Sequence, residues 1–120
     1  MRSKWIEYNG KQIFYQDFSK QFYNSAAVKA ELAEVQEIVK AQPKNSTLVL
    51  TDMRDTNVGA DLLPAMNKAS AETKDFVKKT AVLGVTGIKL KLADLLTAIT
   101  GQPLKYFEDE ETAKNWLTED

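Results

Sequence analysis

The sequence contains neither cysteine nor histidine. Their absence excludes thiol chemistry, disulfide bonds, histidine-based acid–base catalysis and zinc sites of the usual kind. Long apolar runs are also missing. The longest, residues 80–85, is far shorter than the ~20 residues that span a bilayer. Residues 1–10 lack the apolar centre of a secretory signal. We therefore expect a cytoplasmic protein without stable membrane insertion.

Neither sign of charge is in large excess. The chain has 16 basic and 17 acidic side chains among 120 residues. Because dedicated nucleic-acid binders usually carry a basic excess, we expect no nucleic-acid partner. Hydrophobic residues make up 43% and charged residues 28% of the chain, as in ordinary globular domains. The length fits one domain, residues 1–120.

Local patterns predict an alternation of strands and helices. Asn9-Gly10, between two aromatic and β-branched runs, predicts a hairpin with strands at 4–9 and 11–17. Further strands are predicted at 47–51, 80–85 and 104–107, and helices at 24–41, 61–75, 87–99 and 109–117. Helices that connect strands imply parallel neighbours. The predicted fold is a single α/β domain with a mostly parallel sheet of about five strands, an antiparallel N-terminal hairpin and four helices.

Four segments together resemble a known family. Residues 78–87, the tail 107–117, the opening hairpin and residues 48–52 are similar to the SpoIIAA-like proteins, small bacterial relatives of the STAS domains of anti-sigma-factor antagonists. The resemblance covers nearly the whole chain and specifies the fold better than the activity. It implies a non-enzymatic regulatory module that binds a protein partner and is switched by phosphorylation of a serine or threonine after a central strand.

A more distant likeness leads to an alternative function. At the level of the fold, the chain is similar to CRAL-TRIO lipid-binding proteins, which implies a small-molecule or lipid-binding protein. Ligand sites usually enclose about 300–1,000 Å³, which is hard to hollow out of a domain of this size. A homodimer would provide room between its subunits.

The first candidate site is the polar loop at residues 52–59. Open parallel sheets bind their ligands beyond the carboxyl ends of the strands, where this loop begins. With one choice of gap, Thr56 falls at the phosphoacceptor position of the STAS relatives; without a gap, Val58 does. The other predicted partner- or ligand-contacting residues are Asp52, Arg54, Asp55 and Asn57. The alternative is a polar connector that only makes a turn.

The second candidate site is Gly84-Val85-Thr86-Gly87, at a predicted strand–helix junction. Two glycines there can expose backbone amides to an anion. The spacing matches neither a P-loop nor a dinucleotide-binding fingerprint. In the alternative interpretation, Gly84 lets a helix pack closely and Thr86 caps it. We expect the two candidate loops to be neighbours at one end of the sheet.

No pattern indicates a cofactor, a metal or an enzyme. The acidic run at residues 108–111 is explained by its place at a helix start, where carboxylates complement the helix dipole. It lacks the ligand spacing and glycine of a calcium loop. A catalyst would depend on carboxylate, amine or hydroxyl groups, and the sequence shows no nucleophile–base pattern among them. We therefore predict a protein that is not an enzyme.

Overall fold

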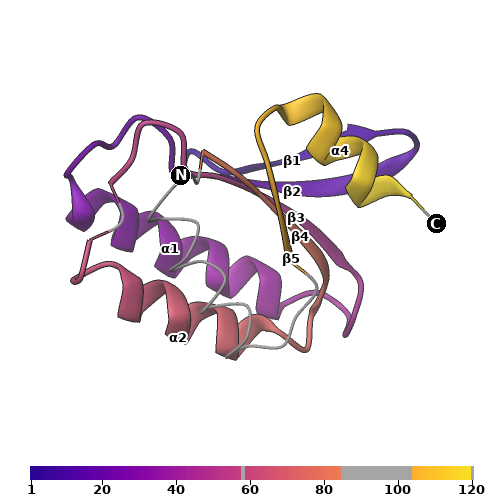
Figure 1. The fold of residues 1–120 in the computed structure, drawn as a ribbon. Coiled ribbons are helices and arrows are strands. Elements are labelled where there is room, and N and C mark those ends of the chain that lie inside the picture. Colours follow the sequence, from indigo (N-terminus) through magenta and orange to yellow (C-terminus); the bar gives the residue numbers. More distant parts are fainter. Residues whose placement is uncertain (58, 85–103, 120) are drawn as a thin grey trace.

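A computed structural model describes residues 1–57, 59–84 and 104–119. Within them, five strands form one mixed sheet in the order of the sequence, β1-β2-β3-β4-β5 (Figure 1). The strands are β1 (Lys4–Tyr8), β2 (Lys11–Asp17), β3 (Thr47–Asp52), β4 (Val77–Leu83) and β5 (Leu104–Phe107). β1 and β2 are antiparallel, whereas β3, β4 and β5 are each added in parallel. The predicted α/β class, strand number and hairpin are confirmed.

The backbone of the hairpin turn matches the preference of the two residues that predicted it. Asn9 and Gly10 have φ angles of 51° and 76°. Both angles lie in the left-handed region that a two-residue hairpin turn requires, and asparagine and glycine adopt it most readily. The turn fixes the register, in which Ile6 pairs with Ile13. β1 ends at Tyr8, one residue before the predicted end.

The helices cover the two faces of the sheet unequally. α1 (Ser25–Lys40) and α2 (Leu63–Thr73) lie side by side on one face, and α4 (Glu110–Thr118) packs on the other (Figure 1). β3 is added beside β2, and β4 beside β3, in the same direction across the sheet. Because both connections are right-handed crossovers, their helices α1 and α2 lie on the same face. The described residues contain these three helices. The fourth predicted helix, residues 87–99, lies outside the described residues.

Each face of the sheet has its own core. Phe14, Val49 and Val82 face α1 and α2, whereas Leu50 and Leu83 face α4. β3 is buried along its whole length, which confirms its prediction as a central strand covered on both faces. Among the described residues, no helix combines the length and the apolarity that crossing a membrane demands.

Several element boundaries differ from the prediction, most of them by one or two residues. α2 begins at Leu63 and not at residue 61, with Pro64 in its first turn. β4 begins at Val77, three residues before the predicted start at 80. The prediction relied on the apolar run, but the start of β4 is set by pairing with β3, since Val77 pairs with Thr47. Lys78, at this end of the strand, is exposed and gives no apolar signal.

Candidate functional site

The carboxyl ends of the parallel strands bring three chain segments together. The segments are the connection from β2 to α1 (18–24), the described parts of the connection from β3 to α2 (53–57 and 59–62) and the N-terminus of α4. We call this region the strand-end edge. Thr86 and Gly87 of the predicted site residues lie outside the described residues. The edge contains the other six, Asp52, Arg54, Asp55, Thr56, Asn57 and Gly84.

Asp52, at the end of β3, is the centre of a buried hydrogen-bond network. Only 1% of this residue is exposed. The hydroxyl of Tyr15 donates to its Oδ2 over 2.6 Å, and the guanidinium of Arg54 binds both of its carboxylate oxygens. Burial raises the pKa of Asp52, but the hydrogen bonds from Arg54 and Tyr15 outweigh burial and hold the pKa below its ordinary value. Burial, followed by the bond to Asp52, raises the pKa of Tyr15.

Arg54 also connects the central strand to α4. Its Nη2 lies 3.4 Å from Oε1 of Glu110, in the first turn of that helix. Glu110 in turn pairs with Lys114, with Nζ and Oε2 2.6 Å apart. Because the side chain of Arg54 is 45% exposed, it is a structural link that still presents part of its surface to solvent.

Gly84 allows the segment after β3 to cross the end of β4. Its φ is +84°, and a Cβ at this position would lie 2.5 Å from the backbone nitrogen of Arg54. The amide of Met53 donates to the carbonyl of Leu83 over 2.9 Å, which holds the two segments together. Gly84 thus has a packing role toward the Met53–Arg54 backbone, whereas the helix that the sequence placed against it lies outside the described residues.

Thr56 is 2% exposed. Its hydroxyl donates to the carbonyl oxygen of Phe18 over 2.5 Å and accepts the amide of Gln21 over 3.1 Å. A phosphoryl group would bring a charge of about −1.5 to −2 into this interior. Phosphorylation of Thr56 therefore requires the surrounding segments to open.

The two connections at the strand-end edge are joined backbone to backbone. The parallel pairing of β2 with β3 continues beyond both strands. The amide of Lys20 donates to the carbonyl of Arg54 over 2.8 Å. The amide of Phe22 donates to Asp55 over 2.9 Å, and the amide of Asn57 donates back to Phe22 over 2.6 Å. The two connections therefore behave as one unit.

This joined unit presents side chains that the sequence analysis did not single out. Phe22 is 60% exposed and Tyr23 is 84% exposed. Asp55 and Asn57, both predicted contact residues, are also exposed. The available signal was the aromatic pair itself, which stands between a strand and the Asn24 cap of α1 without any apolar period.

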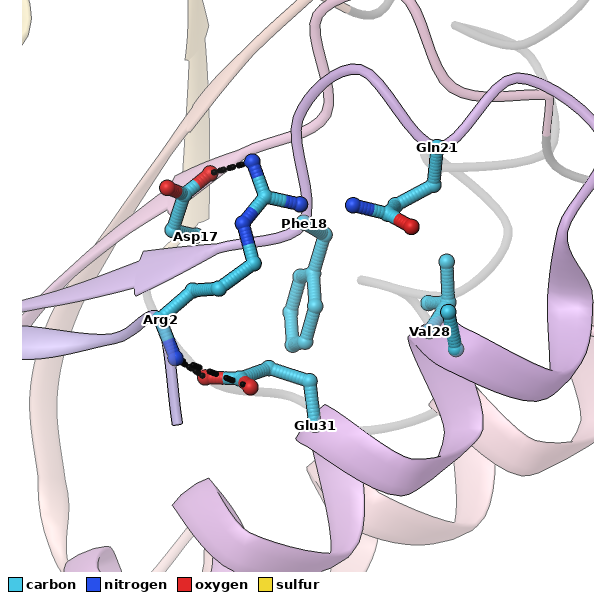
Figure 2. A pocket seen from close by; sticks show the side chains of 7 residues that line it. Arg2, Asp17, Phe18, Gln21, Val28 and Glu31 are labelled. Atoms are coloured by element: carbon cyan, nitrogen blue, oxygen red, sulfur yellow. Dashed lines mark hydrogen bonds and ion pairs between the residues drawn. The ribbon is translucent and has the colours of Figure 1, made fainter.

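A small hollow lies beside this unit, at the start of α1. Figure 2 shows its lining, in which the backbone amide of Arg2 contacts the carboxylate of Glu31 and the Arg2 guanidinium contacts Asp17. Its volume is about 50 Å³. Ligand sites typically enclose about 300–1,000 Å³. The hollow is lined by an ion pair and by hydrogen bonds within the protein, and it is too small for an organic ligand.

Nothing in the described ranges suggests a metal centre, since no group of three or more acidic side chains there is placed to hold a metal ion. Comparison of the chain with protein-family models, curated proteins and solved structures gives no match. The resemblance to SpoIIAA-like proteins therefore stays a prediction, and the functional argument rests on the strand-end edge itself.

Proposed function

We propose that the chain is a non-enzymatic protein-interaction module that binds its partner through the strand-end edge. The observation that carries the proposal is the joining of two connections into one unit by the backbone bonds of Lys20, Phe22 and Asn57. A surface held in place before binding loses less conformational entropy on association. Exposed side chains on a rigid unit therefore favour recognition of a partner.

The titratable groups of this edge favour binding over catalysis. A general acid or base works best with a pKa near the operating pH. The pKa of Asp52 is lowered and that of Tyr15 is raised, so both are displaced away from neutrality. The carboxylate of Asp52 is also occupied by Arg54 and Tyr15. These groups serve to hold the edge in place.

The resemblance to SpoIIAA-like and STAS proteins supplies the regulatory part of the proposal, with the cytoplasm as the expected compartment. In this proposal, a phosphoryl group on Thr56 would separate the two connections and release the partner, since its hydroxyl now bonds Phe18 and Gln21.

The alternative, a small-molecule or lipid-binding protein, has less support. The hollow beside Arg2 measures about 50 Å³, and an organic ligand would need several times that volume. This alternative would require a larger site, such as one formed between two subunits of a homodimer.

The test compares charge insertion at two ends of the sheet. Asn57→Lys places a long cation on the strand-end edge, and Gln12→Lys places one on β2 near the opposite end; both positions are exposed. Immobilised variants are used to capture proteins from the host, and the captured proteins are identified by mass spectrometry. We expect Asn57→Lys to lose a protein that wild type and Gln12→Lys both retain. Identical captured sets for all three would show that the partner binds elsewhere or that none exists.

A further inference from the structure

Phe22 and Tyr23 form an exposed aromatic pair, and the described part of the fold gives no packing reason for it. Among the described residues, two other large apolar side chains are exposed, Met1 at 63% and Trp5 at 40%. Trp5 packs its ring against Phe14, with centroids 4.9 Å apart. Within the described part of the chain, neither Phe22 nor Tyr23 has such a ring contact. Exposed aromatic residues of this kind dominate binding energy at protein interfaces.

The backbone holds this pair in a costly conformation. Phe22 has a φ of 53°, in the left-handed region that bulky residues rarely adopt. Lys20 and Asp55, on the same joined unit, also have positive φ angles, of 58° and 59°. The buried hydroxyl of Thr56 stabilises the unit through its hydrogen bonds with Phe18 and Gln21. Local strain of this kind persists where the surrounding structure enforces it, often at functional positions.

Charge around the pair indicates which partner fits. Acidic side chains outnumber basic ones among the described residues of the strand-end edge and the adjoining helix starts. The acidic group is Asp17, Asp52, Asp55, Asp61, Glu108, Asp109, Glu110 and Glu111, and the basic group is Arg2, Lys20, Lys29, Arg54 and Lys114. Because the net charge of the whole chain is only −1, this acidity is local.

An acidic edge repels nucleic acid, anionic membrane surfaces and the same edge of a second copy. It attracts a surface that carries lysine and arginine. We propose that Phe22 and Tyr23 are an aromatic anchor that inserts into an apolar pocket with a basic rim on a partner protein. This inference rests on the proposed function and names the residues and the partner chemistry at that site.

The probe is a surface-display library of fragments of the host's own proteins, each long enough to fold as a domain, sorted against the full-length chain. Fragments that bind are purified and titrated against wild type and against the double variant Phe22→Asn/Tyr23→Ser. Asparagine tolerates the left-handed conformation, so the variant removes both rings without breaking the turn. Circular dichroism checks that it folds.

We expect the double variant to bind about tenfold or more weakly, as for hot-spot aromatic residues. Binding of wild type should weaken as salt is added, because a basic rim faces an acidic edge. Asp55→Asn, which removes one carboxylate and keeps the turn, should weaken binding, whereas Glu37→Gln, at the far end of α1, should not.

Several outcomes would overturn the inference. Fragments that bind the double variant as tightly as wild type would exclude the aromatic anchor. If the same fragments fail to bind Asn57→Lys, binding at the strand-end edge would still stand without the anchor. If binding depends on none of these residues, both proposals fail. Flotation of wild type, but not of the double variant, with vesicles of equal parts phosphatidylcholine and phosphatidylglycerol would assign the pair to a membrane surface. Self-association lost in the double variant would assign it to a second copy.

Discussion

The guanidinium of Arg54 donates hydrogen bonds to both carboxylate oxygens of Asp52, with Nε 2.9 Å from Oδ1 and Nη2 2.7 Å from Oδ2. The backbone amide of Arg54 donates to the same Oδ1 over 3.0 Å. A carboxylate that is 1% exposed is thus neutralised by the residue two positions along the chain. This arrangement turns the chain sharply at the end of β3 and starts the segment that carries Thr56.

Removing the cation from this pair should destabilise the fold. Arg54→Ala leaves the buried carboxylate of Asp52 with the Tyr15 hydroxyl as its remaining side-chain partner. We expect a loss of about 2 kcal/mol in the free energy of unfolding, less than for a fully buried pair because solvent reaches Arg54. Urea unfolding at neutral pH measures it. Lys40→Ala, which breaks the exposed pair with Glu37, should cost only about 0.3 kcal/mol. Equal losses in the two variants would contradict the role of the buried pair.

Acid should remove the contribution of Asp52. Its folded-state pKa lies below the ordinary value of 3.8, so its stabilisation is complete above that value and is lost as the pH falls through the lower folded-state pKa. Glu31 also has a lowered pKa and contributes in parallel. Asp52→Asn isolates the effect. The stability difference between wild type and Asp52→Asn, from urea unfolding over a pH series, should shrink on acidification. A difference that stays constant would show that Asp52 does not titrate differently on folding.

Gly84 and Gly10 provide a matched pair of glycine substitutions. Both have positive φ, of +84° and +76°, but a Cβ at Gly10 meets nothing within 4 Å, whereas at Gly84 it meets the backbone of Arg54 at 2.5 Å. Gly10→Ala should cost about 1 kcal/mol from the left-handed conformation alone. Gly84→Ala should cost more, roughly 3 kcal/mol, because backbone must also move. Thermal unfolding compares them, and similar melting temperatures would refute the close contact.

The hydroxyl of Thr56 should control the joining of the two connections. Thr56→Val keeps the shape but leaves the Phe18 carbonyl and the Gln21 amide without this partner, which should cost about 1–3 kcal/mol. Thr56→Ser restores the hydroxyl and should recover most of the loss. Amide hydrogen exchange at Phe22 and Asn57 provides the local measurement. Faster exchange in Thr56→Val but not in Thr56→Ser is expected; no change in either would show that backbone bonds alone hold the unit.

Much of the scaffold follows from local patterns in the sequence. Asn9-Gly10 specified the hairpin, because few other residue pairs accept two left-handed conformations in succession. The apolar run beginning at Thr47 specified a strand covered on both faces. The alternation of helices and strands specified parallel pairing, whereas the order of the strands in the sheet came from the structure. These features depend on local periodicity and turn chemistry, which can be inferred from neighbouring residues.

The tertiary structure alone decided the site. Thr56 was predicted as a candidate phosphoacceptor, yet its hydroxyl faces Phe18, 38 residues away in the chain. The exposure of Phe22 could not be inferred either, because a residue in a connection lies outside the hydrophobic periodicity of helices and strands. Its left-handed backbone depends on bonds to Asp55 and from Asn57. Side-chain direction in such a connection is set by hydrogen bonds between distant segments, and these form only once the sheet has brought the ends of β2 and β3 together.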